Sequence, residues 1–150
     1  MEQKQQLTEE ELSLKLFIVL SRALEEVKKQ VIKDIKSYEL NLSEFAVLEL
    51  LYHKGEQPIQ IIGKKVLLAS SSITYVVDKL EQKGLLERHA CPKDRRVIHG
   101  RLTDKGKALM EEVFPQHEKA MANIFASLST EEKEQAIELL KKIGLFAEEM

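Results

Sequence analysis

The chain has 150 residues, of which 43% are hydrophobic and 32% charged, so it is long enough for one small domain with a sizeable core. No run of about 18 uncharged apolar residues occurs, which excludes a membrane span. The polar, acidic start also lacks the pattern of a secretory signal. The single cysteine excludes an internal disulfide framework and suits a reducing compartment, so we expect a cytoplasmic protein.

The net charge of −2 hides an uneven distribution of charge along the chain. From Lys54 to Lys107 there are 12 Lys+Arg and 6 Asp+Glu, whereas the other residues hold 11 Lys+Arg and 19 Asp+Glu. A basic centre between acidic ends is typical of a protein that binds a polyanion. The alternative is a solvated surface on which cations cluster by chance.

The first predicted helix begins after Thr8, which forms the pattern of a capping box with Glu11. Apolar residues then recur at spacings of three and four to about residue 37, and they include Leu12, Leu16 and Leu20. Such a helix is roughly 40 Å long. It is longer than one small core can cover, so we expect its apolar stripe to pack against a partner.

Two further helices follow in the chain. One is expected to begin at Ser43 as its N-cap and to end at Lys54, where Gly55 gives a C-terminal signal. Pro58 then opens a short helix from Ile59 to about Val66.

The segment LLASSSITYVVDKLEQKG predicts the next helix, capped by Ser70 or Ser71 and ended at Lys83-Gly84. Its buried face is expected to hold Ile73, Val76, Val77 and Leu80. Hydrogen-bonding side chains occupy the opposite face: Ser71, Ser72, Thr74, Tyr75 and Lys79.

Two short runs, LLERHA and VIHGRL, are expected to pair as strands joined by a loop from Cys91 to Arg96. This loop holds three cations, Lys93, Arg95 and Arg96, around one carboxylate. We expect Asp94 to orient Arg96 through a charge-assisted hydrogen bond.

The last two helices complete the pattern. Thr103 is the expected N-cap of the first, and Pro115 predicts a kink within it. Ser129 and Glu132 form a second capping box, and the final helix is expected to turn Ile137, Leu140 and Ile143 inward.

This order of elements predicts a mainly α fold with a small β-hairpin, a winged helix-turn-helix. We expect one domain over residues 1–150, with the DNA-binding core at about 43–106. Helices at about 8–37 and 107–150 would then form a homodimer, because a two-fold operator needs two protein copies. The residues expected at the dimer contact are Leu12, Leu16, Leu20, Ile137 and Leu140.

The partner expected for this core is double-stranded operator DNA. The outer face of the serine-rich helix would enter the major groove, with Ser70, Ser71, Ser72, Thr74, Tyr75 and Lys79 as contacts. The wing residues Lys93, Asp94, Arg95 and Arg96 would lie at a minor groove, and Lys64 and Lys65 at the backbone. Structural alternatives are serines that only cap the helix, lysines at a solvated helix end, and an ordinary exposed hairpin.

Two motifs resemble hallmarks of the MarR family of bacterial transcriptional regulators. One is a recognition helix ending in D-x-L-E-x-x-G-L-[IV]-x-R, and the other is a wing with D-x-R-x-x-x-x-x-L-T-x-x-G. The matching residues are Asp78, Leu80, Glu81, Gly84, Leu85, Arg88, Asp94, Arg96, Leu102, Thr103 and Gly106. The resemblance extends from about Leu12 to Leu145. Leu86 and Gly100 depart from it, since β-branched residues are usual there, and Gly100 predicts a short or irregular strand.

The resemblance implies a homodimeric repressor with interdigitating terminal helices. NLSEFAVLELLYHKGEQPIQ and CPKDRR are most similar to the subgroup that responds to quinones and hydroquinones. This implies a phenolic or quinone-like effector that releases the protein from DNA. Family effectors often bind between the dimerisation helices and the core, where Phe17, Tyr38 and His53 are candidates.

Cys91 is the other candidate for an effector or redox site, because Arg88, His89 and Lys93 lie close in sequence and cations lower a thiol pKa. An incidental thiol is the alternative. The spacing of His89, Cys91 and His99 matches no zinc pattern, and we expect no metal and no cofactor.

The sequence leaves two other classes of function open. Some winged-helix domains act purely as protein-interaction modules, and such a module would not bind an operator. An enzyme using Cys91 with His89 or His99 would lack a third orienting residue, an oxyanion loop and a nucleotide motif, so we do not expect one.

Overall fold

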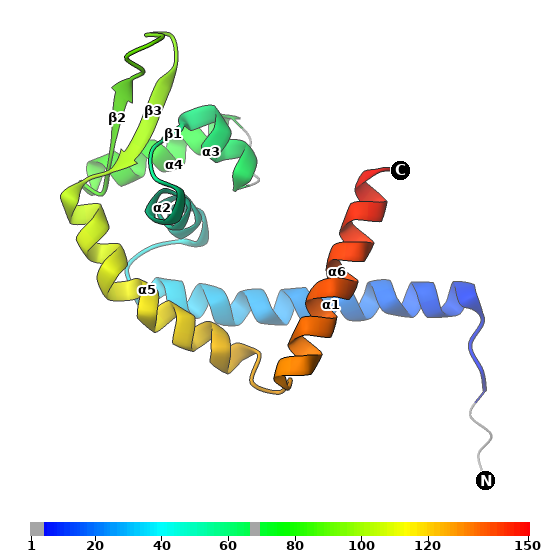
Figure 1. Ribbon diagram of the computed structural model, residues 1–150. Helices are drawn as coiled ribbons and strands as arrows, with labels where there is room; N and C mark the ends of the chain where they lie inside the picture. Colours follow the sequence, from blue (N-terminus) through cyan, green and yellow to red (C-terminus); the bar gives the residue numbers. More distant parts are fainter. Residues whose placement is uncertain (1–4, 67–69) are drawn as a thin grey trace.

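The computed structural model describes residues 5–66 and 70–150, without the side chains of residues 70 and 71. Within these residues the elements follow the predicted order, with one additional strand (Figure 1). They are α1 (Glu9–Lys36), α2 (Leu42–Lys54), β1 (Gln57–Pro58), α3 (Ile59–Lys65), α4 (Ser70–Gln82), β2 (Leu86–Ala90), β3 (Ile98–Leu102), α5 (Asp104–Ile124) and α6 (Thr130–Glu148). The mainly α winged-helix architecture is therefore confirmed.

Local capping explains where the long helices begin. Thr8 and Glu11 form the predicted capping box of α1, with hydrogen bonds of 3.0 and 3.2 Å between each side chain and the other's backbone N–H. Ser129 and Glu132 do the same for α6, so both predictions are confirmed.

The predicted start of α2 at Ser43 was wrong. The N-cap is Asn41, whose Oδ1 accepts from the Glu44 N–H at 2.8 Å while the Glu44 carboxylate accepts from the Asn41 N–H at 3.1 Å. An asparagine with a glutamate three residues later forms the same reciprocal box as Ser or Thr.

The three strands form one antiparallel sheet in the order β1-β3-β2. The predicted hairpin is confirmed, with Leu86 opposite Leu102 and Ala90 opposite Ile98. The two-residue strand β1 was not predicted, and it pairs Gln57 with Gly100.

Gly100 does not interrupt β3, contrary to the expectation of an irregular strand. It is buried and paired on both sides, by Gln57 and by Arg88. A Cβ on Gly100 would lie 3.3 Å from Ile62 Cδ1, so the missing side chain leaves room for α3 to pack on the sheet.

The hydrophobic core lies where α1, α2 and α5 meet the winged helix. Its largest fully buried side chains are those of Phe45, Ile35, Leu48, Ile62, Leu80, Leu86, Met110, Val47 and Val77. The predicted inner face of α4 is confirmed, because Ile73, Val76, Val77 and Leu80 are all buried. This packing fixes the outer face of α4 toward solvent.

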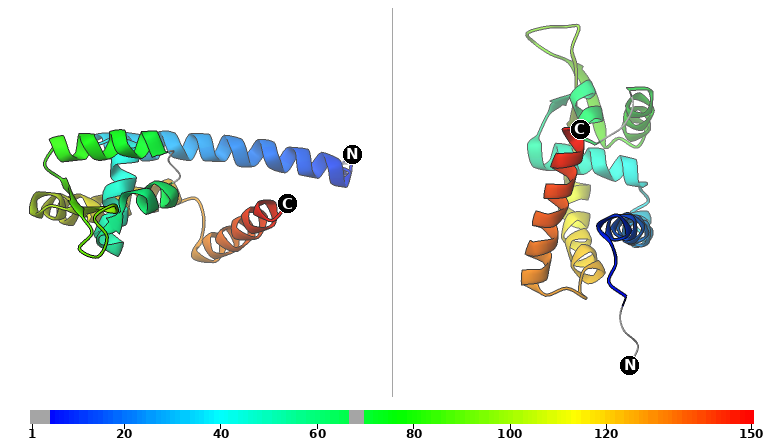
Figure 2. Two further views of the ribbon diagram at one scale, coloured as in Figure 1. Left: turned by 90° about the horizontal axis from the view of Figure 1, so that it is seen from above. Right: turned by 90° about the vertical axis from the view of Figure 1, so that its right-hand side faces the viewer.

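The terminal helices extend away from this core (Figures 1 and 2). The expectation that α6 turns its apolar residues inward was wrong within one chain, since Ile137 is 51% exposed and Leu140 49% exposed. On α1, Leu12 and Leu16 are likewise about half exposed, at 48% and 53%. A single copy of the chain thus leaves two apolar helix faces uncovered.

Helix α5 runs through Pro115 without a break in its assignment. Its ribbon changes direction part-way along its length, in agreement with the predicted kink (Figure 1). Proline has no N–H to donate to the carbonyl four residues earlier, which accounts for a bend. Among the described residues, none of the helices is both long and apolar enough to cross a membrane.

Candidate nucleic-acid interface

The outer face of α4 carries the polar side chains that the sequence placed there. Ser72, Thr74, Tyr75 and Lys79 are exposed, and the Tyr75 side chain is 62% accessible. Lys79 Nζ lies 5.5 Å from the centre of the Tyr75 ring, close enough for a cation–π contact. The side chains of Ser70 and Ser71, and the proposed capping at this end, lie outside the described residues.

The wing tip has the predicted hydrogen bond between its carboxylate and one of its cations. Asp94 Oδ1 accepts from the backbone N–H of Arg96 at 3.0 Å and from its Nε at 3.2 Å. The Arg96 side chain is nevertheless 93% exposed, and Lys93 and Arg95 are exposed beside it. Asp94 therefore orients a guanidinium that still faces solvent.

Arg88 connects the recognition helix to the wing. Its guanidinium contacts Asp78 Oδ1 at 2.5 Å and Glu81 Oε2 at 3.2 Å, and its backbone N–H donates to Glu81 Oε1 at 3.1 Å. Both carboxylates belong to α4, whereas Arg88 belongs to β2. These contacts fix the angle between the two elements.

A second set of contacts holds the base of the hairpin. Gly84 has φ +74°, and the N–H groups of Gly84 and Leu85 donate to Glu81 and Leu80, which ends α4 in a Schellman motif. Thr103 Oγ1 donates to the Gly84 carbonyl at 2.6 Å and accepts from the Gly106 N–H at 3.0 Å. The wing and α5 are thereby attached to the end of α4.

A groove of about 320 Å³ lies between α3, α4 and the wing, with Thr74, Arg88 and Arg96 among its lining residues. Lys64 and Lys65 are exposed at the end of α3, and Lys65 Nζ lies 3.2 Å from Gln57 Oε1. A further cation of the wing is already paired with a carboxylate of the same chain. Arg101 Nε donates to Glu87 Oε1 at 2.6 Å across the hairpin.

Cys91 is half-buried at the end of the hairpin, where its N–H donates to the Val97 carbonyl at 2.9 Å. Of the three cationic or basic residues expected near the thiol, two contact carboxylates on other segments. Arg88 pairs with α4, and His89 faces Glu56. The structure thus gives the thiol fewer cationic contacts than the sequence suggested.

The three candidate effector residues do not come together within one chain. Phe17 and Tyr38 are separated by the length of most of α1, roughly 30 Å at 1.5 Å per residue, and Phe17 is 70% exposed. His53 contacts the ring of Phe114, with centroids 4.6 Å apart.

A polar group that was not predicted lies where α1, α2 and α5 meet. Asp34 accepts from the Tyr38 hydroxyl at 2.7 Å, and its other oxygen lies 2.8 Å from Nδ1 of His117, a largely buried residue. Burial, together with the neighbouring Asp34 carboxylate, raises the pKa of Tyr38 from 10.0 to about 12.

Known proteins share this arrangement. The sequence model of the MarR family matches residues 40–98, from the start of α2 to the wing. The HTH-type transcriptional regulator MhqR of Bacillus subtilis is 55% identical over 139 residues, covering 93% of this chain and 96% of that protein. The chain belongs to the MarR family.

Solved structures support the same fold. Sco3205, a MarR family regulator from Streptomyces coelicolor solved in complex with DNA, has a TM-score of 0.81 at 19% identity and covers 96% of this chain and 91% of its own. BpsR of Bordetella bronchiseptica, whose DNA binding is regulated by 6-hydroxynicotinic acid, has a TM-score of 0.76 at 27% identity. The matched regions of BpsR are 84% of this chain and 90% of that one.

The MarR hallmark residues are explained by these contacts. Asp78, Glu81 and Arg88 hold α4 against the wing, and Asp94 orients Arg96. A Cβ on Gly106 would lie only 2.1 Å from the Leu85 carbonyl oxygen, so that position admits only glycine. Asp78, Glu81 and Arg88 carry the resemblance to the family, but their role in joining α4 to the wing was not predicted, although oppositely charged residues in one motif were a signal for it.

Proposed function

We propose that this protein is a homodimeric transcriptional repressor that binds double-stranded operator DNA with α4 and the wing. The observation that carries the proposal is the Arg88 bridge, which holds an exposed polar helix face and an exposed cationic hairpin in one fixed relation. A rigid pair of elements suits DNA, whose grooves have a fixed spacing.

The division of roles follows from the chemistry of the two elements. Tyr75 and Lys79 on α4 can reach base edges in the major groove, and the short hydroxyl side chains beside them can donate to bases or phosphates. Arg96 and its neighbours at the wing tip have long, narrow side chains that end in a positive charge, which suits a narrow minor groove or its phosphates. Lys64 and Lys65 would add backbone contacts.

The dimer is supported by the uncovered apolar faces of α1 and α6. Besides Leu12, Leu16, Ile137 and Leu140, large exposed residues there include Phe17 and Phe146, each 70% accessible. Contiguous apolar surface of this kind is typical of an interface. A second copy of the chain would cover it and would set two α4 helices at a fixed distance.

We further propose a small phenolic or quinone-like effector. Support comes from the sequence resemblance to the quinone-responsive subgroup and from BpsR, a structural relative regulated by a hydroxylated aromatic acid. A quinone acts either by accepting the Cys91 thiolate at a ring carbon, with uptake of a proton that gives the substituted hydroquinone, or by non-covalent binding near the junction of the terminal helices and the core. A phenol or hydroquinone acts only by non-covalent binding.

The test is DNA binding to the region upstream of the protein's own gene, measured at two salt concentrations with and without 2-methylhydroquinone. A shuffled fragment of equal length serves as the DNA control. We expect tight binding that weakens with salt, because phosphate contacts release counterions, and that is abolished by the compound. Repeating the titration with 2-methyl-1,4-benzoquinone, on the wild-type protein and on Cys91→Ser, separates thiol addition from non-covalent binding.

Any other result of the titration would contradict a specific part of the proposal. Binding that ignores the compound leaves the regulator but removes the quinone effector. Equal affinity for the shuffled fragment removes the specific operator. Absence of binding to any upstream fragment favours the alternative of a winged-helix module that contacts an acidic protein.

A further inference from the structure

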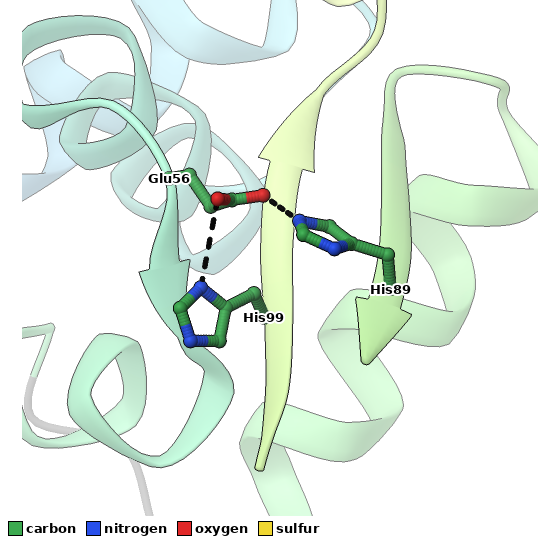
Figure 3. Close-up of side chains that lie close together, drawn as sticks. All are labelled: Glu56, His89 and His99. Atoms are coloured by element: carbon green, nitrogen blue, oxygen red, sulfur yellow. Dashed lines mark ion pairs between the residues drawn. The ribbon is translucent and has the colours of Figure 1, made fainter. Parts of the chain in front are cut away.

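Three side chains from three different segments converge on one side of the wing sheet (Figure 3). His89 on β2 lies directly opposite His99 on β3, and His99 also pairs with Pro58 on β1. Glu56 immediately precedes β1, so its carboxylate reaches both rings. Directly opposed residues of an antiparallel pair project to the same face, which accounts for the two close imidazoles.

The Ala90 carbonyl favours one tautomer of His89. Nδ1 lies 3.1 Å from this carbonyl, which can only accept, so the hydrogen bond forms in the tautomer whose proton is on Nδ1. In the neutral ring, Nε2 then presents a lone pair, and this lone pair faces Oε1 of Glu56. A carboxylate and an imidazole lone pair repel each other unless the ring takes up a proton and forms an ion pair, or both atoms bind one cation.

His99 presents a second nitrogen to the same carboxylate. Its Nδ1 lies 3.6 Å from Glu56 Oε2, which is too far for a hydrogen bond. Nδ1 of His99 and Nε2 of His89 are both buried atoms that lack a hydrogen-bond partner within the described parts of the chain. The ligand atoms of the three residues all lie within 4.8 Å of one another.

We propose that Glu56, His89 and His99 form a binding site for a divalent transition metal ion of the zinc type. Imidazole nitrogens and a carboxylate are zinc ligands, and tetrahedral ligands at about 2 Å from the ion lie roughly 3.3 Å apart. The three atoms, which lie within 4.8 Å of one another, would have to move to that spacing when an ion binds. The Nδ1–H bond to a carbonyl is also the contact that metal-ligating histidines commonly make with their second nitrogen.

The site has a structural consequence that is independent of DNA binding. It would join the segment after α2 to both strands of the wing, so an ion would stiffen the base of the hairpin. Three protein ligands leave further coordination positions open to water or another ligand. Cys91 does not belong to the group of ligand atoms.

The experiment measures metal binding by the full-length, tag-free protein after treatment with a chelator. Zn²⁺ is titrated against a chromophoric chelator, and Co²⁺ is used as a spectroscopic substitute. We expect one ion per chain, and we expect His89→Gln and Glu56→Gln each to weaken binding about 100-fold or more. His53→Gln, which removes an exposed histidine outside the cluster, and Cys91→Ser serve as controls that retain full affinity.

Nitrogen NMR of the unmodified protein gives a readout that does not depend on a variant folding. Zinc should shift Nε2 of His89 and Nδ1 of His99 and leave His53 and His117 unchanged. A proton shared between Glu56 and the histidines is the competing explanation of the geometry. The proposal is overturned if zinc leaves both signals unmoved, or if His53→Gln or Cys91→Ser weakens binding as much as His89→Gln does.

Discussion

At the wing tip, a single carboxylate controls the direction of a cation. Asp94 contacts both the backbone and the side chain of Arg96, yet it leaves the guanidinium 93% exposed. Exposed ion pairs add little to stability, so the gain from this contact lies in orientation. Asp94 would be repelled by phosphate, but in this role it is compatible with the proposed contact of the wing tip with DNA.

Arg96 and Tyr75 should contribute differently to DNA binding. Arg96→Ala is expected to weaken binding about equally across operator variants and to reduce the dependence on salt, because it removes a charge from the backbone or minor groove. Tyr75→Ala is expected to change the ranking of operator variants by about 1–3 kcal/mol at the contacted position. Fluorescence anisotropy with a panel of single-base variants measures both effects. Equal, uniform losses for the two variants would contradict this division of roles.

Gly106 is required by the close approach of α5 to the end of α4. Gly106→Ala would place a Cβ 2.1 Å from a backbone oxygen, and we expect a loss of about 3 kcal/mol in the free energy of unfolding. Gly144→Ala is the matched control, because a Cβ there meets nothing within 4 Å and alanine favours a helix. Urea denaturation compares the two. Equal stability of both variants would mean that the Leu85 carbonyl moves away without cost.

Tyr38 makes the stability of the protein depend on pH in the alkaline range. Its pKa is about 12 in the folded chain against 10.0 for an ordinary tyrosine. Between these values the unfolded chain has lost the proton that the folded chain retains, so stability falls as pH rises from 10 to 12 and is unaffected by this group at lower pH.

Tyrosinate absorbance measures this titration directly. Tyr38→Phe should remove the step near pH 12 and flatten the decrease in thermal stability above pH 10. Persistence of that step in the variant would assign the raised pKa to another group.

At the scale of the elements, the sequence predicted what depends on local patterns. Capping residues located the starts of α1, α5 and α6, and apolar spacing identified the buried face of α4. Asn41 was missed because Ser43 is an equally good cap, although Glu44 at the third position after Asn41 distinguishes the two. Strand β1 was missed because two residues, one of them proline, have no periodicity.

The side-chain clusters could not be predicted because they depend on distant segments. Glu56 meets the two histidines only because β1 joins the sheet beside β3, a pairing that no local pattern indicates. Asp34 and His117 lie 83 residues apart in the chain. The prediction that the apolar face of α6 turns inward was wrong because none of the residues of α6 is buried within one chain.

The apolar stripe of α1 should be required for dimer formation. Replacing Leu16 and Leu20 together with glutamate would put two carboxylates into the interface, and we expect monomers that bind DNA at least about tenfold more weakly. Lys33→Glu adds a carboxylate to an exposed polar position of the same helix and should leave the dimer intact. Light scattering gives the oligomeric state, and circular dichroism checks that the fold is retained. A double variant that stays dimeric would exclude this stripe from the interface.

In the molecule as a whole, the basic surface and the exposed apolar surface lie on different elements. The basic centre of the sequence forms the winged helix, whereas the acidic ends form the long helices that extend from it (Figure 2). One copy of the chain thus presents the proposed DNA-binding surface at one end and uncovered apolar helices at the other. Two copies joined through the helices would present two such surfaces to one duplex.

A hydroxyl-radical footprint on the DNA upstream of the protein's own gene tests this account most directly. We predict two protected half-sites on one face of the duplex, with centres separated by one or more whole turns of about 10–10.5 base pairs. Protection of a single half-site by the wild-type protein, or no protection at any concentration, would contradict a dimer that places two α4 helices in successive major grooves.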